Sequence, residues 1–579
     1  MSSLEDFCYA YFKPLAKLFI KAYGGLEDDM EAANMKIHPE VYLSIVAFLI
    51  VVSMIGFVIY LSLMLLNLTP PYLSNPYLLV MISSLPLIIL IVGFSIPRMM
   101  ASNRISGLKN EIPYASMYLS VMVSGGLSPY ASLLRLRRTG LLPELRKEID
   151  RIQRIVLTSG QDPVTAMAKA AKVIGLREFK ELLLGYASTL KTGGDVLHYL
   201  YRQTESMFKS LAIRVKAMGQ NMGMLLEAYT IVAILGALGL YMVFIVSLSF
   251  PSFQAFPPDV FFLFAFIILP SVSIVFLYFA DTLQISYPVS QWKAYVALFF
   301  SVPLGVFLLI QMVLPFYGLS LFNLPSLTQI PVHIRDMLNL NEGTEPALGM
   351  AVTLISTSIP VYILDSHYSE KEKEILQGVT SFLRDLVENR KTGLSPEKSI
   401  QILSERDYGK FSKHLRVMSA KISWGIPLRR IFEDFMNEVK SWPSLVNTYL
   451  LIDTIEVGGG TEESLETLAE FAESSRELES ERNALLKPLF IVPYMGAALL
   501  TVTTVMLLQL FANIHSMGEA LISINSLTQM LITPLILHSF TIGLVAGKIV
   551  AGRISAGFKH AIFLILISII GVYIARYIL

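Results

Sequence analysis

Cysteine is almost absent from this chain, since Cys8 is the single thiol among 579 residues. A disulfide within the chain, a zinc site built from thiolates and an iron–sulfur cluster each need two or more cysteines, so all three are excluded. The eight histidines are scattered, and no His-Glu-x-x-His pattern occurs. We therefore expect neither a metal site nor a cofactor.

Charge is scarce as well. Charged residues make up 16% of the chain, whereas a soluble domain carries about 25%. Hydrophobic residues make up 54%, the mean hydropathy is +0.58 and the net charge is only +1. A small net charge argues against a nucleic-acid-binding protein that relies on bulk charge. These values are typical of a membrane protein.

Common catalytic motifs are missing too. The chain lacks the phosphate-binding pattern Gly-x-x-x-x-Gly-Lys-Ser/Thr and the nucleophile pattern Gly-x-Ser-x-Gly. We therefore do not expect the chain to be its own ATPase, and we assign no catalytic residues. The expectation is a protein that is not an enzyme.

Long apolar runs set the expected architecture, because a transmembrane helix needs about 20 mostly apolar residues. The two long stretches between groups of such runs, 98–222 and 365–487, are polar and helical in pattern. The sequence thus predicts an all-α polytopic membrane protein with about nine transmembrane helices and two helical-bundle domains arranged as a tandem repeat. The candidate spans are 41–67, 77–97, 225–250, 260–280, 293–317, 346–364, 488–513, 528–550 and 560–578.

Lysine and arginine predict the orientation, because loops on the cytoplasmic side carry more of both. Residues 98–222 hold 19 of them and residues 365–487 hold 17, whereas the expected outer loops hold only Arg335. We therefore expect the N-terminus and both polar domains on the cytoplasmic side of the cell membrane. The predicted domains are an N-terminal amphipathic segment at 1–40, two transmembrane helices at 41–97, a first cytoplasmic domain at 98–222, three transmembrane helices at 223–317, an external loop at 318–345, a transmembrane helix at 346–364, a second cytoplasmic domain at 365–487 and three transmembrane helices at 488–579.

The N-terminal segment has a basic face. Lys13, Lys17 and Lys21 recur every four residues and so share one side of a helix, while aromatic and aliphatic side chains lie away from it. Such a helix suits the surface of the inner leaflet. Packing on the first polar domain is the alternative.

An internal repeat is the strongest pattern in the sequence. Gly-Leu-Ser-Pro at 126–129 recurs at 393–396, and Gly193-Gly194 recurs as Gly459-Gly460. The offsets between these pairs are 267 and 266 positions. In each Gly-Leu-Ser-Pro the glycine predicts a turn, the serine a helix cap and the proline a first helical residue. The glycine pairs predict the end of one helix, followed by a capping residue and a new helix.

Each glycine pair precedes a stretch of unusual length without proline. From Asp195 to Phe250 there is none, which predicts a continuous helix of about 55 residues, or about 80 Å. Such a rod would connect a polar domain rigidly to the membrane bundle. Gly219 and Gly223 offer the alternative of a bend at the membrane surface.

The chain resembles the type II secretion system F-domain family on these residues. The resemblance rests on the Gly-Leu-Ser-Pro turn heading each repeat and on the glycine turn with its helical tail, which in the second copy reads Glu456-Val457-Gly458-Gly459-Gly460. The first copy has Leu190 where the second has Glu456. With two fused repeats, the chain is similar to archaeal assembly-platform proteins of type IV pili and archaella, and to a fusion of the paired tight-adherence platform proteins.

The resemblance implies a non-catalytic platform in the cytoplasmic membrane for protein secretion or for assembly of a type IV pilus or archaellum. Its implied partners are a hexameric cytoplasmic secretion ATPase, pilin- or archaellin-like subunits and the lipid bilayer, with a homodimer left open and no nucleic acid. Hinge or coupling positions are expected at Gly193, Gly194, Glu456, Gly458, Gly459 and Gly460. Candidate contacts to the ATPase are Arg135, Arg137, Arg138, Arg151 and Arg154.

The two polar domains differ in charge. Residues 98–222 hold 19 basic and 9 acidic side chains, whereas 365–487 hold 17 and 22. We hypothesise that the domains pair with each other or contact different faces of the ATPase. Ordinary solvated helix faces are the alternative.

A polytopic transporter is the rival function. Transporters generally need ionisable groups inside the bilayer, and the predicted spans hold few. Glu227 and His538 are the two that this rival would have to use.

Overall fold

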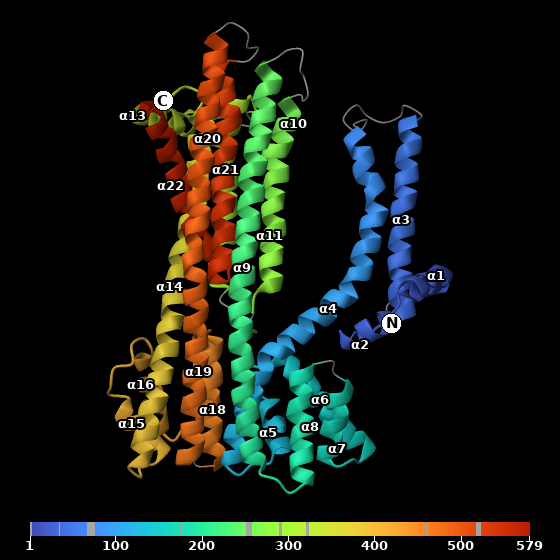
Figure 1. Cartoon of the computed structure of the whole chain (residues 1–579), viewed down its shortest axis with the longest axis vertical. Helices are drawn as coiled ribbons and strands as arrows, with labels where there is room; N and C mark the ends of the chain where they lie inside the picture. The colour runs from blue at the N-terminus through green and yellow to red at the C-terminus, as the bar shows by residue number, and fades with distance from the viewer. Residues whose placement is uncertain are drawn as a thin grey trace. The chain divides into compact units, whose positions relative to one another are not determined.

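The computed structural model describes residues 3–33, 35–65, 76–173, 176–249, 258–285, 287–288, 292–319, 324–458, 460–516 and 523–578. Every regular element in these ranges is a helix, as predicted (Figure 1). The chain divides into two compact units, and each is described by itself. The first contains residues 1–119 and 128–204, and the second contains residues 120–127 and 205–579.

The first unit holds the N-terminal helices and a small bundle. Ser116 and Thr204 are hydrogen-bonded at 2.6 Å in this bundle, and this bond joins the C-terminal part of α4 to the start of α9. Its elements are α1 (Ser3–Ala22), α2 (Leu26–Ala32), α3 (Pro39–Leu65), most of α4 (Pro76–Ser124), α5 (Pro129–Leu136), α6 (Pro143–Ser159), α7 (Pro163–Val173), α8 (Arg177–Lys191) and the first residues of α9 (Val196–Ser249).

Helix α1 packs on α3, which is a candidate transmembrane helix, and not on the small bundle as one prediction had it. The rings of Phe7 and Phe12 meet that of Phe48 edge to face, and Cys8 and Ala16 are fully buried. Cys8, Phe12 and Ala16 lie on the face of α1 away from its lysines. The helix therefore covers the first turns of α3.

The second unit holds most of the membrane bundle and the second small bundle. Its elements are the rest of α9, α10 (Pro258–Leu263), η2 (Phe264–Ile268), α11 (Leu269–Leu283), α12 (Lys293–Met312), η3 (Leu314–Tyr317), α13 (Pro325–Leu338), α14 (Glu345–Lys391), α15 (Pro396–Leu403), α16 (Phe411–Ser423), α17 (Leu428–Glu438), α18 (Trp442–Gly458), α19 (Glu462–Leu486), η4 (Lys487–Phe490), α20 (Ile491–Ser516), α21 (Ile524–Ala551) and α22 (Ile554–Ile578).

Eight helices of the described residues are long and apolar enough to cross a membrane, so the chain is a multi-pass membrane protein. They correspond to eight of the nine predicted spans. The ninth, 77–97, falls in α4, where the side chains of residues 76–85 lie outside the described ones.

Helix α21 lies in the middle of the second unit's membrane bundle. It packs against α11, α14, α20 and α22, and 78% of its apolar window is buried. Small residues bring α21 and α22 close together, because a Cβ on Gly547 would lie 2.1 Å from the Cα of Gly557. Close contact through glycine is a common way to hold transmembrane helices together.

The tandem repeat is visible in the helices themselves. Helices α5 and α15 are both eight residues long and start with Pro129 and Pro396, which are 267 positions apart. Helices α4 and α14, which precede them, end at Ser124 and Lys391, also 267 apart. Helices α9 and α19 start 266 positions apart. The structure thus confirms two copies of one helical unit.

Candidate functional site

The turn that heads each repeat has the predicted geometry. The Ser128 hydroxyl accepts the Ala131 N–H at 3.3 Å, and the Ser395 hydroxyl accepts the Lys398 N–H at 3.3 Å. A glycine with positive φ precedes each serine by two residues. Both serines therefore cap helices that begin at a proline.

The glycine turn of the first copy also follows the prediction. Gly193 has φ +72° and ends α8, and the Asp195 carboxylate accepts the His198 N–H at 3.0 Å. A Cβ on Gly193 would meet nothing within 4 Å in the described part of the chain. Space therefore allows a side chain there, and the backbone conformation is what favours glycine. Gly194, by contrast, lies close to Thr189, whose Cγ2 would be 3.1 Å from an added Cβ.

The glycine turn of the second copy is tighter. Helix α18 ends at Gly458, Gly459 lies outside the described residues, and Gly460 has φ +61°. A Cβ on Gly460 would come within 2.9 Å of the ring of Pro396. The Thr461 hydroxyl then caps α19 by accepting the Ser464 N–H at 3.3 Å.

One arginine joins the two turns of the second copy. Arg390, in the last turn of α14, donates from Nε to the Gly460 carbonyl at 3.0 Å and from Nη1 to the Leu394 carbonyl. The first copy has Val123 at the equivalent position. Sequence reasoning missed Arg390, because nothing in the local pattern marks it. Gly460 is therefore held in place by contacts on both sides, which makes it a fixed corner between helices.

Glu456 has a defined partner. Its carboxylate accepts the Arg429 N–H at 3.1 Å, and Arg429 is the second residue of α17. An anion at this end of a helix pairs with free N–H groups and with the positive end of the dipole. Glu456 thus caps a neighbouring helix within its own repeat.

The five candidate arginines of the first repeat differ in their surroundings. Arg138 and Arg154 are exposed, while Arg135 and Arg151 are half-buried. Arg137 pairs with Asp150 at 3.2 Å. Arg135 and Arg138 are three positions apart, a spacing that would put them on one face of a helix. They do not lie on the same helix, because α5 ends at Leu136 and Arg138 lies in the turn beyond it.

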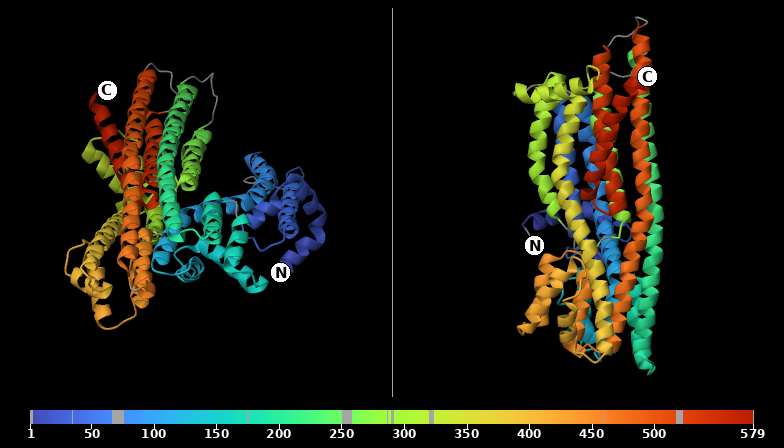
Figure 2. Two further views of the ribbon diagram at one scale, coloured as in Figure 1. Left: turned by 60° about the horizontal axis from the view of Figure 1, so that its bottom comes forward. Right: turned by 90° about the vertical axis from the view of Figure 1, so that its left-hand side faces the viewer.

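Two long rods run through the second unit. Helix α9 is continuous over 54 residues, which corresponds to about 81 Å. The second rod is α19, η4 and α20, with Pro488 in its short 3-10 turn. The two rods lie side by side in both figures (Figures 1 and 2).

The predicted alternative of a bend at Gly219 or Gly223 was wrong. Both glycines lie inside α9 and face the second rod. A Cβ on Gly219 would lie 3.2 Å from the Cβ of Leu485, and one on Gly223 would lie 3.6 Å from a methyl of Leu489. The glycines therefore let the rods approach each other closely.

Ion pairs tie the membrane helices together near the turn between α21 and α22. Lys548 of α21 pairs with Asp281 of α11, and the Arg553 Nε lies 3.1 Å from the Asp365 carboxylate of α14. The Ser555 hydroxyl donates to the same carboxylate at 2.7 Å. These contacts therefore join α11 of the first repeat with α14 and α21 of the second repeat near the turn between α21 and α22.

The two residues that a transporter would use are placed differently. Glu227 is exposed on α9, whereas His538 is buried in α21. A coupling carboxylate would be expected inside the bundle or along a water-filled path. The position of Glu227 therefore gives the transporter no support.

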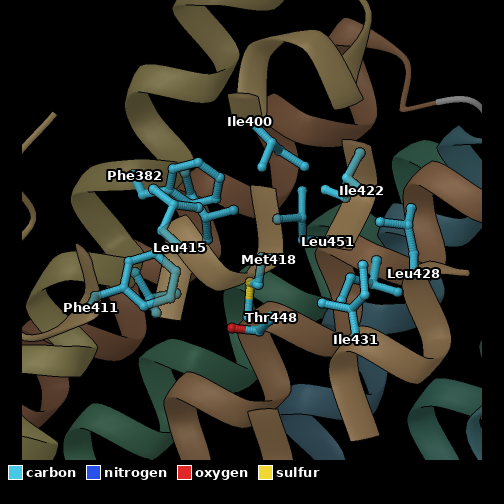
Figure 3. A pocket seen from close by; sticks show the side chains of 13 residues that line it. Phe382, Ile400, Phe411, Leu415, Met418, Ile422, Leu428, Ile431, Thr448 and Leu451 are labelled. Atoms are coloured by element: carbon cyan, nitrogen blue, oxygen red, sulfur yellow. The ribbon is translucent and has the colours of Figure 1, made fainter. Parts of the chain in front are cut away.

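A small cavity lies in the core of the second helical domain (Figure 3). Its volume is about 20 Å³, room for about one water molecule. The Thr448 hydroxyl is the polar group of its lining, and no partner is found for it among the described residues. The other lining side chains are apolar and include Phe382, Phe411, Leu415 and Met418. The cavity has no acid or base for chemistry, and we interpret it as a packing void.

Comparison with known proteins agrees with the repeat. Residues 115–244 and 382–509 each match the family described as type II secretion system (T2SS), protein F. An uncharacterised protein of Methanocaldococcus jannaschii is 21% identical over 506 residues, which is 83% of this chain and 82% of the relative. No solved structure matches. The two matches begin 267 positions apart, and each covers the glycine turn and the start of a rod, so each repeat carries a region that matches the type II secretion system protein F family.

Proposed function

We propose that this chain is a non-catalytic platform in the cytoplasmic membrane that couples a hexameric secretion ATPase to the insertion of pilin-like subunits into a filament of the type IV pilus or archaellum kind. The single observation that carries the proposal is the pair of rods. Each begins at the glycine turn of a repeat and continues into the membrane bundle, the first rod as one helix and the second through a single 3-10 turn.

A rod of this kind transmits displacement because a helix resists bending over its length. In the proposal, the ATPase binds the helical domains on the cytoplasmic side and moves them. The fixed corner at Gly460, with Arg390 and Pro396 against it, passes that motion into α19 without absorbing it. The rods then shift the membrane helices that surround a subunit entering the filament.

Binding of the ATPase is assigned to basic residues of the first repeat. Arg138 and Arg154 are the exposed members of the five candidates. Charged residues at such a contact mainly set orientation and encounter rate. Exposed arginines can set the orientation of a bound partner at small structural cost, because surface ion pairs within the chain contribute little to stability.

The test uses the full chain in lipid nanodiscs and the hexameric secretion ATPase of the same organism. We expect the ATPase to bind and its ATP hydrolysis to rise in the presence of the platform. The double variant Arg138→Glu/Arg154→Glu should weaken binding at least tenfold. Arg177→Glu is the matched control, since Arg177 is 87% exposed and lies on another helix of the same bundle.

Two results would end the proposal. One is that the intact chain leaves ATPase binding and hydrolysis unchanged. The other is that the purified chain alone moves a solute across proteoliposomes, which would favour a transporter. In cells, replacing Gly459 with valine is expected to abolish filament assembly while membrane insertion continues.

A further inference from the structure

The contacts between the two rods join equivalent positions of the two repeats. Gly219 faces Leu485, Gly223 faces Leu489, and Thr230 faces Gly496. In each pair the two residues are 266 positions apart, which is the offset between the starts of α9 and α19. The rods therefore run parallel and in register, like the two helices of a parallel dimer.

The seam between the rods pairs a small residue with a larger one at each of these levels. On α9 the glycines at 219 and 223 receive the leucines of the second rod. The roles are reversed one to two turns further on. There a Cβ on Gly496 would lie 2.6 Å from a methyl of Ile234 and 3.1 Å from the methyl of Thr230. Small and large residues thus alternate across the seam.

The seam is dry. Met218, Met222 and Leu226 of α9 are at most 5% exposed, and Leu486 and Ala497 of the second rod are at most 1% exposed. These side chains form one apolar cluster. Nearer the start of the rods, the rings of Phe208 and Phe471 stack at 5.6 Å between centroids. The two rods are in direct apolar contact here, so side-chain size decides which helix fits.

Pairing of identical rods in the same register would fit badly. Two copies of α9 would place glycine opposite glycine at 219 and at 223, which leaves voids. Two copies of the second rod would place Leu485 against Leu485 and Leu489 against Leu489, at a spacing that now accommodates one leucine and one glycine. Overpacking of that kind is also unfavourable.

We propose that the seam is a heterotypic recognition surface. It pairs the rod of one repeat with the rod of the other repeat in the same chain, and it disfavours pairing with a second copy of the same rod. Specificity here comes from complementary sizes combined with a clash or void against the wrong partner. One chain thereby contains a complete parallel pair of rods. Any homodimer must then use another face. The inference rests on packing alone and does not depend on the proposed function.

Disulfide trapping tests the seam in the full-length protein. Cys8 is the single cysteine, so a Cys8→Ala background removes all native thiols. The variant Gly219→Cys/Leu485→Cys places two Cβ atoms about 3.2 Å apart before relaxation, close to the roughly 3.5–4.5 Å of a disulfide. A protease site introduced within residues 320–323 allows a link between the halves to be detected. We expect oxidised membranes to yield two halves that stay joined until reduction.

The single variants Gly219→Cys and Leu485→Cys are the matched controls. Identical rods paired in register would bring the introduced thiols of two chains together, at position 219 or at position 485, and give a crosslinked dimer. We expect at least tenfold less dimer from either single variant than intrachain product from the double variant. Dimer from a single variant at a level similar to that product, or absence of the intrachain product, would overturn the inference.

A size swap provides a second measurement. Gly219→Leu should reduce the recovery of monodisperse protein because of the clash, and Leu485→Gly should lower its melting temperature because of the void. The double variant Gly219→Leu/Leu485→Gly restores one large and one small residue, and we expect it to recover most of both losses. If the double variant is no better than the sum of the two single effects, the proposed matching of side-chain sizes at this level is contradicted.

Discussion

At the scale of single residues, the two repeats solve the same capping problem in different ways. In the first repeat Asp162 caps α7 locally, because its carboxylate accepts the Val164 N–H at 3.1 Å. The second repeat has Pro427 just before α17, which cannot accept through a side chain. Glu456 supplies the carboxylate from α18 instead. In the first repeat, Leu190 stands where the second repeat has Glu456. Because Asp162 already caps α7, no carboxylate is needed at position 190.

This compensation can be tested by exchange. Glu456→Leu should destabilise the start of α17 by about 1 kcal/mol, the usual cost of losing a helix cap. Adding Pro427→Asp should restore most of that loss by providing a local cap. Hydrogen exchange of the amides at 428–432 is the measurement. If the double variant exchanged as fast as Glu456→Leu alone, the capping role would be wrong.

A buried carboxylate caps a helix in the first repeat as well. Glu111 accepts the N–H groups of Glu144 and Leu145, at 3.2 and 2.7 Å, where α6 has no side-chain cap of its own. Burial nevertheless raises the pKa of the Glu111 carboxyl to about 7, although both backbone bonds favour the ionised form. Desolvation is the larger effect here.

The stability of the first bundle should therefore fall as the pH rises. The pKa of Glu111 is higher in the folded state than its ordinary 4.5, so its contribution is fully present below about pH 4.5 and is lost as the pH passes 7. Glu111→Gln removes the charge at every pH and keeps one oxygen that can accept a backbone N–H. Relative to the wild type, the variant should gain about 3 kcal/mol of stability between pH 5 and pH 8.5, from a pKa shift of about 2.5 units. Thermal unfolding of both proteins at the two pH values checks this, and an equal difference at both would contradict it.

Local caps could be predicted and distant ones could not. Ser128, Ser395, Asp162, Asp195 and Thr461 each bond within three residues, so a short motif reveals them. Glu111, Arg390 and Glu456 each have a partner that lies 27 to 70 positions away. No local pattern contains that information, because the fold brings these residues together.

At the scale of helices, the first rod was predictable from the absence of proline. The continuation of the second rod past Pro488 and the pairing of the two rods were not. A glycine in a helix weakens it by itself, which is why a bend at Gly219 was a reasonable alternative. Contact with Leu485 offsets that cost. The sequence pattern cannot distinguish a glycine that bends a helix from one that admits a neighbour.

The corner at the start of the second rod gives a prediction at the same scale. Arg390→Met keeps an apolar stem but removes the hydrogen bonds to the Gly460 and Leu394 carbonyls. We expect a local loss of about 2 kcal/mol, typical of bonds from a charged donor. Amide exchange at 460–465 should accelerate about thirtyfold, and filament assembly should fall.

Arg384→Met is the matched control for Arg390→Met. Arg384 lies on the same helix, is 68% exposed and pairs with Glu473 at 3.1 Å on the surface. Exposed pairs contribute little to stability, so this variant should change exchange at 460–465 by less than about threefold. Equal effects from the two variants would show that Arg390 is an ordinary surface charge.

At the scale of the whole molecule, the proposed function depends on which side of the membrane each repeat occupies. The distribution of lysine and arginine predicts that both helical domains lie in the cytoplasm. The loop that carries α13 between α12 and α14 is then external. An ATPase in the cytoplasm can reach the helical domains only in this orientation.

Labelling of single cysteines decides the orientation with little perturbation. Cys8 is fully buried and is the single cysteine, so a Cys8→Ala background has no thiol for a maleimide to label. Met337 on α13 is 87% exposed and Trp424 at the end of α16 is 76% exposed, so cysteine at either place is open to reagent. An impermeant maleimide should label Met337→Cys in intact cells and Trp424→Cys only after permeabilisation. Labelling of Trp424→Cys in intact cells would put the second helical domain outside. That result would remove the ATPase from the proposal while leaving the pairing of the rods untouched, since the seam is set by packing within the chain.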